Sequence, residues 1–523
     1  MLMKRTITRL SRKWKHQRRA AGSNAGAKAL SGSISGFCRV LAVSAITALG
    51  LGEARAATLF WDPGTGGILG GNGTWDTTSP QWWNGVTDSA WNNLLNNTAV
   101  FPIPQDPLNQ GVFVNLVNDV TVGALTFGAG YSVSSNFNTI TIASTIANPA
   151  TKTITVTNSS DTATIGAELL GTGGFTKAGA GTLKLTADSS AGITGGITIA
   201  GGTLDVNNKA GFISTGILNS ANAVNFTSTS TLQFTATTGG STLNLSALTF
   251  NGGEGTVKVQ ADSPSDFATL TFSSLGTRAA GATGNFIQNG TGIGNTKIVF
   301  TTLAPTIPAG GGFISQGLFF TDGFGNNNFA FYDAGGFVRG INYGVDANTA
   351  TQTGSGTGFA PGSAGKHVQV TADVTGQGNI TIRTLNLAGT FTANGGILQN
   401  PGTTITLTSA GILKSGGGFA PISGGILDAG SNELVIRADA ALDALKISSV
   451  VTGSGGLTKS GQGSLELNPQ TPGALSLGGS STTSGTDTVT LASAAPAGLF
   501  RGCVFSALGF RRAPSSRRFR ERP

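Results

Sequence analysis

Short runs in which apolar residues alternate with polar residues, mostly threonine, recur along most of the chain. A period of two places the apolar side chains on one face of a β-strand, so these runs predict strands that are buried on one side. Such runs occur at 140–142, 154–156, 257–259, 368–370, 380–382, 405–407 and 489–491. Glycine and asparagine separate them, which predicts short strands joined by tight turns.

One segment occurs twice, 282 residues apart: residues 171–185 read GTGGFTKAGAGTLKL and residues 453–467 read GSGGLTKSGQGSLEL. The glycines at 179 and 181 predict a turn with positive φ, and the two leucines that follow fall on one face of a strand. The shared glycines, lysine and leucines are Gly171, Gly173, Gly174, Lys177, Gly179, Gly181, Leu183 and Leu185 in the first copy, and Gly453, Gly455, Gly456, Lys459, Gly461, Gly463, Leu465 and Leu467 in the second.

Shorter repeated segments indicate how the strands are arranged. Gly-Ile-Leu recurs at Gly396, Gly411 and Gly425, at spacings of 15 and 14 residues. One-sided strands at this spacing bury their apolar faces by stacking as successive coils. The sequence therefore predicts an all-β protein, a right-handed parallel β-solenoid. A set of β-sandwiches is the rival architecture, but Asn-Gly or Asp-Gly pairs flanked by strands, the usual hairpin signals, are few.

Composition and charge narrow the functional classes. Glycine makes up 81 of 523 residues and only 11% of residues are charged, whereas about 25% is typical, which argues against an ordinary enzyme. The hydrophobic content of 39% argues against disorder. The net charge of +8 comes from the two ends of the chain, because residues 57–500 carry 14 basic and 22 acidic residues. An acidic body predicts no nucleic-acid partner.

The amino-terminal end predicts a secretory signal. A basic stretch at 4–39 precedes an apolar run at 40–52, which is too short to span a bilayer, and small residues predict cleavage between Ala56 and Ala57. We therefore expect an extended signal peptide over residues 1–56 and an exported protein. Because Cys38 would leave with the signal and Cys503 lies in the tail, residues 57–500 contain no cysteine for a disulfide.

Tryptophan is concentrated after the predicted signal. Within 31 residues lie Trp61, Trp75, Trp82, Trp83 and Trp91. Exposed aromatic faces bind sugar rings, while buried ones can cap the open end of a solenoid against water and edge pairing. Both roles, glycan contact and cap, are open on the sequence. We expect a Trp-rich cap with the first coils at 57–130, solenoid repeats at 131–500, including repeat segments at 171–186 and 453–467, and a basic tail at 501–523.

The residues available for catalysis are few. His367 is the single histidine after the signal, so a histidine metal cluster is excluded, and its place on an alternating strand predicts a solvent-facing side chain. Carboxylate pairs for a polysaccharide lyase or hydrolase are conceivable at Asp439 with Asp443 and at Asp262 with Asp266. The turns at 70–76 and 322–328 depart from calcium-binding loops. We expect no catalytic residues, no metal and no cofactor.

The two repeat segments resemble the autotransporter-associated β-strand repeat in passengers of type V secreted proteins. The Trp-rich start at 59–93 is similar to the opening of such passengers, and FAFYDAGGFVRGINY at 329–343 resembles a segment that links their repeat blocks. The resemblance implies a structural or adhesive surface protein, and the expected partners are host or environmental glycans or surface proteins.

Self-secreting members of that family end in a transmembrane β-barrel, for which the 32 residues after Leu491 are too few. We therefore expect no translocator barrel and no membrane insertion by this chain. Its location would be the cell surface, outer membrane or extracellular space if a barrel is supplied, and the periplasm if not. The alternatives are a carbohydrate-active β-helix enzyme and a truncated, non-functional autotransporter.

Overall fold

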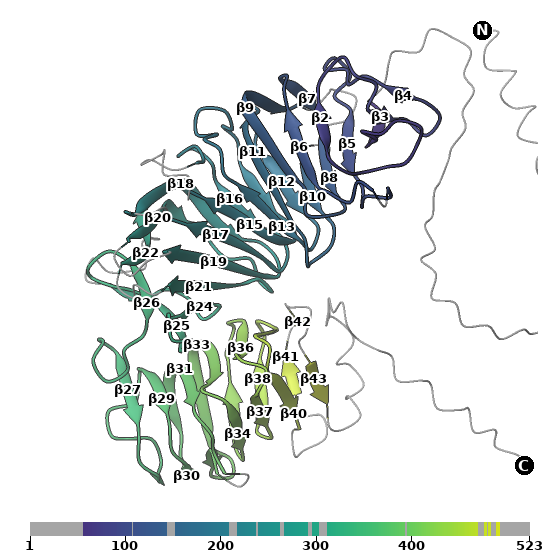
Figure 1. Ribbon diagram of the computed structural model, residues 1–523. Helices are drawn as coiled ribbons and strands as arrows, with labels where there is room; N and C mark the ends of the chain where they lie inside the picture. Colours follow the sequence, from purple (N-terminus) through teal and green to yellow (C-terminus); the bar gives the residue numbers. More distant parts are fainter. Residues whose placement is uncertain are drawn as a thin grey trace, which may run out of the picture. The chain divides into compact units, whose positions relative to one another are not determined.

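The computed structural model describes residues 56–468, except 107, 144–151, 209–216, 237–238, 262–265, 291–294, 303–310 and 393–394, together with 475–477, 480–482 and 488–491 (Figure 1). The regular structure of these residues is β-strand throughout. No helix in the described part of the chain has the length and apolar character needed to cross a membrane. Residues 1–55 of the predicted signal at 1–56, and the predicted tail at 501–523, lie outside the described residues.

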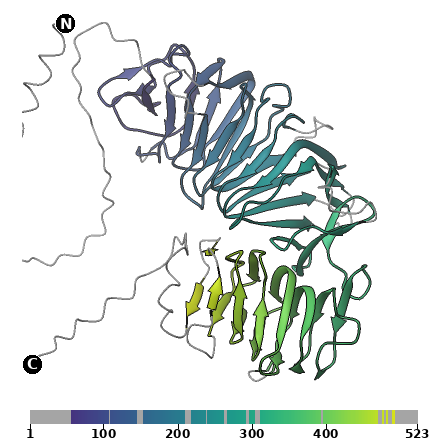
Figure 2. The ribbon, with the colours of Figure 1, turned by 180° about the vertical axis from the view of Figure 1, so that it is seen from behind.

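The N-terminal stack consists of two sheets whose strands alternate along the chain (Figures 1 and 2). Its first sheet contains β1 (Thr58–Trp61), β3 (Trp82–Trp83), β4 (Asp88–Ser89), β5 (Thr98–Phe101), β8 (Ala124–Phe127), β10 (Thr153–Val156), β12 (Phe175–Ala178), β14 (Ile197–Ile199), β16 (Val224–Phe226), β18 (Ser241–Phe250), β20 (Ala268–Leu275) and β22 (Thr296–Thr302). Its second sheet contains β2 (Gly73–Trp75), β6 (Phe113–Leu116), β7 (Val120–Val122), β9 (Ser132–Ile142), β11 (Thr162–Leu170), β13 (Thr182–Leu185), β15 (Gly202–Asn207), β17 (Ser230–Thr235), β19 (Glu254–Ala261), β21 (Thr283–Gly290), β23 (Gly312–Phe313), β24 (Leu318–Thr321), β25 (Asn327–Tyr332) and β26 (Val338–Gly340).

The C-terminal stack is built in the same way. One sheet contains β27 (Thr349–Gln352), β29 (His367–Val370), β31 (Ile380–Ala388), β33 (Thr404–Ser415), β35 (Ile426–Asp428), β36 (Leu434–Ala438), β38 (Val450–Gly453), β39 (Leu457–Ser460), β41 (Leu475–Leu477) and β42 (Ser480–Thr482). The other contains β28 (Gly356–Thr357), β30 (Val374–Gln377), β32 (Ile397–Gln399), β34 (Gly418–Ser423), β37 (Asp443–Ile447), β40 (Ser464–Leu467) and β43 (Thr488–Leu491).

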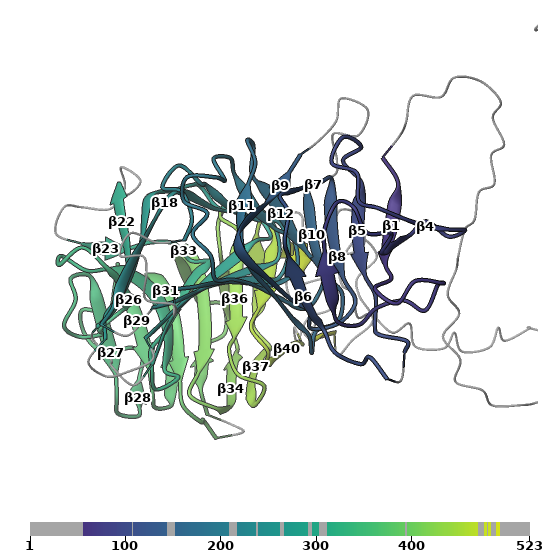
Figure 3. The same cartoon turned by 45° about the horizontal axis from the view of Figure 1, so that its top comes forward.

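Apart from β1, β3 and β4 and from β23–β26, neighbouring strands within each stack pair in parallel, so like residues lie above like residues. One buried row runs across β13, β15, β17 and β19 through Leu183, Leu204, Leu232 and Val257. The residues that alternate with this row along each strand are polar and lie on the opposite face, as the period-two alternation predicts. The side-by-side ladder of strands is also visible in Figure 3. The predicted all-β parallel β-solenoid is confirmed.

Between the two stacks the parallel ladder is interrupted, where the sequence predicted continuous coils. After β24, the chain reverses: β25 pairs antiparallel with β24, β23 and β26. Apolar side chains of the C-terminal stack form a core of their own. The interruption falls on residues 312–340, which include most of the segment that resembled a linker between repeat blocks. Antiparallel pairing ends the first stack because β25 occupies the edge that a further coil would need.

Candidate functional site

The tryptophans of the amino-terminal coils form one aromatic cluster. Trp61 and Trp82 lie opposite each other on β1 and β3, and their ring centroids are 5.2 Å apart. Trp82 also contacts Trp75 at 5.0 Å and Trp91 at 4.7 Å. Phe101 of β5 lies beneath them, 5.5 Å from Trp82. It stacks in turn on Phe127 of the next coil at 5.1 Å, so the cluster continues the apolar interior.

Burial distinguishes the five tryptophans. Trp61, Trp75 and Trp82 have no exposed surface and Trp91 is 2% exposed, whereas Trp83 is partly exposed. A side chain without exposed surface offers no face for a sugar ring. The geometry therefore leaves Trp83 as the member of this group that can contact a glycan, and places the other four in the interior at the amino-terminal end of the stack.

A carboxylate stabilises the turn that leads out of β2. Asp76 Oδ1 accepts hydrogen bonds from the amides of Thr78 at 2.7 Å and Ser79 at 2.5 Å, and Asp76 Oδ2 accepts one from Ser79 Oγ at 2.6 Å. Burial alone would raise the pKa of Asp76, but the hydrogen bonds from Ser79 and Thr78 lower it to about 2. Both oxygens of this carboxylate are therefore used within the turn.

The repeat lysine points into the interior rather than to solvent. Lys177 occupies an inward position of β12, between Ile154 and Ile199 of the adjacent coils, and is 0% exposed. Its ammonium donates to the carbonyl oxygens of Ala178 at 2.8 Å, Gly179 at 3.1 Å and Gly201 at 3.0 Å. Burial lowers the pKa of Lys177 to about 8, which leaves it charged at neutral pH. The lysine thus ties together the turns of two consecutive coils.

Two more lysines lie at inward positions, on different rows of the C-terminal stack. Lys459 lies in register with Ile436 and donates to the carbonyl of Gly461. Lys414 of β33 donates to the carbonyls of Ser415 at 2.8 Å and Gly417 at 2.6 Å. Lys414 was not predicted from the sequence, although Lys-Ser-Gly at 414–416 repeats the Lys-Ser-Gly at 459–461.

The repeat glycines are required mainly by close approach of neighbouring coils. A Cβ on Gly174 would lie 1.7 Å from the Gly196 oxygen, and Gly174 also has a φ of 72°. Gly179 has the predicted positive φ, at 77°, but Gly181 does not adopt one. Instead, a Cβ on Gly181 would lie 2.4 Å from the Asn158 oxygen. The prediction of positive φ is therefore wrong at Gly181, where contact with the preceding coil explains the glycine.

His367 is buried, so the prediction of a solvent-facing histidine is wrong. It points away from the core of the C-terminal stack but is only 2% exposed, because the ring of Phe313 covers it at a centroid distance of 4.3 Å. His367 Nδ1 lies 2.9 Å from Thr384 Oγ1. Burial, helped by the charge of Arg383, lowers the pKa of His367 to about 4, so the ring is neutral at neutral pH.

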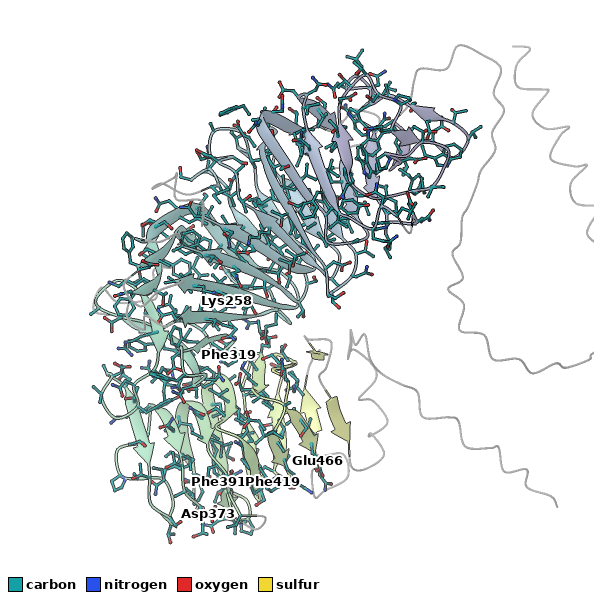
Figure 4. The ribbon with its side chains drawn as sticks, viewed as in Figure 1. Lys258, Phe319, Asp373, Phe391, Phe419 and Glu466 are labelled. Atoms are coloured by element: carbon teal, nitrogen blue, oxygen red, sulfur yellow. The ribbon has the colours of Figure 1, made fainter. Side chains whose placement is uncertain are left out.

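Phe313 belongs to a small apolar cluster that joins β24–β26 to the outer face of the C-terminal stack. The members from the two sides are Phe319, Phe329, Phe331, Ile341, Leu413 and Val435. Figure 4 labels Phe319 on β24. Ion pairs surround the cluster: Arg437 lies over the Phe319 ring at 4.8 Å and contacts Glu254 at 2.7 Å, and Arg278 contacts Glu433 at 2.6 Å. Two ion pairs, Arg437 with Glu254 and Arg278 with Glu433, thus join residues of the two stacks.

The carboxylates that could have served a glycosidase are engaged elsewhere. Asp443 is paired with Lys414 at 2.9 Å, with both side chains fully buried, and Asp439 is paired with Arg437 at 2.6 Å. Asp266 accepts a hydrogen bond from the Gly239 amide, and Asp262 lies outside the described residues. Among the described residues, no group of three or more His, Cys, Asp and Glu side chains is arranged to hold a metal ion.

Comparison with characterised proteins supports the resemblance seen in the repeats. Part of the chain is similar to the adhesin BmaC autotransporter of Brucella suis biovar 1 (strain 1330), with 40% identity over 181 residues. The aligned region is 33% of this chain and 5% of that protein, so the chain corresponds to a small part of its relative. No protein-family model and no solved structure matches. The similarity and the β-solenoid together confirm the resemblance to an autotransporter passenger.

The buried lysine turns generate a stability prediction. Replacing Lys177 by methionine keeps the apolar stem but leaves three carbonyls without their donor. We expect Lys177→Met to lower the free energy of unfolding by at least about 1–3 kcal/mol, measured by urea denaturation. Lys184→Met is the matched control, because Lys184 lies half-exposed on the next strand, and it should change stability by less than about 0.5 kcal/mol. Equal effects of the two substitutions would contradict the role assigned to Lys177.

The burial of His367 generates a pH prediction. Its pKa is about 4 in the folded protein, below the usual value of about 6.5, so the unfolded chain binds the proton first as pH falls. The stability that His367 contributes is complete above pH 6.5 and is lost as pH falls toward 4. We expect the Tm of the wild type to fall more over this interval than that of His367→Gln. Parallel Tm profiles would show that the histidine is not buried in this way.

Proposed function

We propose that the chain is an exported, passenger-like adhesive protein that functions as a non-enzymatic, repeat-built surface rod. The observation that carries the proposal is the similarity to an autotransporter adhesin in a chain whose described residues form a parallel β-solenoid. A stacked solenoid extends a constant cross-section over many coils, which suits a surface that must project and present contacts.

The outer faces of the coils support an adhesive role. Threonines follow one another on consecutive strands β13, β15, β17 and β19, in register at Thr182, Thr203, Thr231 and Thr256. Their side chains are half-buried and belong to the outward rows that also hold Lys258, labelled in Figure 4. A repeated row of hydroxyl groups offers many weak hydrogen bonds rather than one deep site, which favours extended partners such as glycans or surface proteins.

One observation favours adhesion over the alternative of a carbohydrate-active enzyme. Asp439 is paired with Arg437 and Asp443 with Lys414, whereas general acid catalysis needs a carboxyl that can reach the substrate.

The proposed location is the cell surface, or the extracellular space, when a translocator is supplied. Without a translocator, an exported chain of this kind would remain in the periplasm.

The function is tested by incubating the purified exported protein with a panel of immobilised glycans and with host-cell and abiotic surfaces. We expect retained binding, with each glycan recovered at its original chain length. Release of shortened or unsaturated sugars would contradict the proposal and support the enzyme alternative. Failure to bind any of these surfaces would contradict the adhesive role.

The exposure of the tryptophans generates a more specific prediction. Trp83 has an accessible face and Trp82 has none, so Trp83→Ala should weaken binding to a captured glycan severalfold while changing Tm little. Trp82→Ala removes a fully buried ring and should cost about 3–5 kcal/mol of stability. Both quantities are measured on the same two variants, by surface binding and by thermal unfolding. Glycan binding that is unchanged in Trp83→Ala would exclude Trp83 as the contact.

A further inference from the structure

Three strand ends meet beside the tryptophan cluster. Asp62 follows β1, Gln81 precedes β3, and Asp88 begins β4. The pairing of β1 with β3 and of β3 with β4 brings these positions together, and the Asp62 amide donates to the Gln81 carbonyl at 2.9 Å. Trp83 lies opposite Asp88 in this small antiparallel unit. Residues separated by up to 26 positions in sequence therefore share one corner of the fold.

One oxygen of each carboxylate is held by the turn after β1. The Gly67 amide donates to Asp62 Oδ2 at 2.6 Å, and the Gly66 amide donates to Asp88 Oδ2 at 2.8 Å. These two consecutive amides orient the two carboxylates from the same side. The remaining oxygen of each carboxylate is thereby fixed in direction rather than free to turn to solvent.

The three remaining side-chain oxygens at this corner are buried and accept no hydrogen bond from the described residues. They are Asp62 Oδ1, Asp88 Oδ1 and Gln81 Oε1. The Asp62 side chain is 0% exposed, so its oxygen cannot be satisfied by bulk water. Buried acceptors without donors cost about 1–3 kcal/mol each, and more for charged groups. Three buried acceptors without donors, on residues that strand pairing brings to one corner of the fold, call for a species that is positively charged or carries protons.

The surrounding chain supplies no cation of its own. Residues 57–151 contain five aspartates and no lysine, arginine or histidine. Burial raises the pKa of Asp62, the hydrogen bond from the Gly67 amide opposes this shift, and the negative charge of the neighbouring Asp88 carboxylate adds to it. Like charges that share a buried site are stable only with a bound cation or a shared proton.

We propose that Asp62 Oδ1, Asp88 Oδ1 and Gln81 Oε1 form a binding site for a hard divalent cation, Ca²⁺ in the first place. The donors are all oxygen, from two carboxylates and one amide, which is the ligand set that Ca²⁺ and Mg²⁺ prefer. Ca²⁺ is favoured because it accepts irregular geometry, whereas Mg²⁺ requires a near-ideal octahedron. With three protein ligands, water completes the coordination, and the expected dissociation constant is about 10⁻⁴–10⁻³ M, as in extracellular modules.

The ion would connect the turn at 62–67 to the starts of β3 and β4. Trp82 and Trp83 form β3, and Trp61 directly precedes the turn, so the cation would stabilise the packing at the amino-terminal end of the stack. In many habitats Ca²⁺ is millimolar outside the cell but not in the cytoplasm, so an exported protein meets this concentration only after export. The amino-terminal end of the stack would therefore be better ordered in a compartment that contains Ca²⁺ than in one that lacks it.

The test uses the exported protein after treatment with EDTA, and the probe is Tb³⁺, a luminescent substitute for Ca²⁺ that is excited by energy transfer from nearby tryptophan. We expect saturable Tb³⁺ luminescence that Ca²⁺ displaces at lower concentration than Mg²⁺. We also expect Ca²⁺ to raise the thermal midpoint by roughly 2–4 °C, followed by tryptophan fluorescence. The absence of a luminescent complex in the wild type, or identical midpoints in EDTA and Ca²⁺, overturns the proposal in favour of water or a shared proton.

Substitutions localise the site. Asp62→Asn and Asp88→Asn should each reduce Tb³⁺ luminescence at least about tenfold. The matched control is Asp76→Asn, since Asp76 lies in the same region but uses both oxygens within its own turn, and it should retain the cation response. Gln81→Glu adds a third carboxylate and should tighten Tb³⁺ binding, which keeps the test decisive if an aspartate variant does not fold. Loss of luminescence in Asp76→Asn, or unchanged affinity in Gln81→Glu, overturns the assignment.

Discussion

In-register stacking of parallel strands is the constraint on which the rest of this structure depends. Each residue of a stacked strand lies about 4.8 Å from the equivalent residue of the coil before it and of the coil after it. These two neighbours determine its environment. Where the row is apolar, the result is a continuous interior, as in the stacked rings of Phe226 and Phe250, whose centroids are 5.4 Å apart and whose planes are nearly parallel. Where two backbones come closest, only glycine fits, as at Gly174. One geometric rule thus explains both the threonine-rich alternation and the glycine content.

The buried lysines follow from the same rule. Stacked turns bring the carbonyls of consecutive coils together, and these carbonyls need a donor that the backbone cannot supply at a turn. An inward lysine reaches them with an ammonium group that has three protons, and at Lys177 three carbonyls use them. Burying an unpaired charge is costly, but each of these hydrogen bonds involves a charged donor and is stronger than a neutral one. Lys414, which lies on a different row from Lys459, has the additional partner Asp443, so an inward lysine can also form a full ion pair.

The repeating parts of the fold could be predicted from the sequence, and the non-repeating parts could not. Period-two alternation predicted the inward faces of strands such as β13, because burial on one side imposes that period. It could not predict the burial of His367, since the covering ring of Phe313 lies 54 residues earlier and joins through antiparallel pairing that leaves no periodic signal. Nor could it choose between exposed and buried tryptophans, because composition does not record which faces are packed. The corner formed by Asp62, Gln81 and Asp88 depends on the pairing of three strands that are two to four residues long.

The non-repeating places are also where a solenoid is most vulnerable, and this links stability to the proposed adhesive role. A coil in the middle of a stack is held from both sides, whereas a terminal coil is held from one side and opens more easily. In this chain, unusual chemistry is concentrated at such places: the tryptophans and paired carboxylates at the amino-terminal end, and Arg437, Arg278 and His367 at the interruption near β24–β26. Repeated threonine rows can present contacts to a partner only while the coils beneath them stay closed. The ends therefore determine how much of the polar outer surface is available, even though the contacts themselves lie along the middle of the stacks.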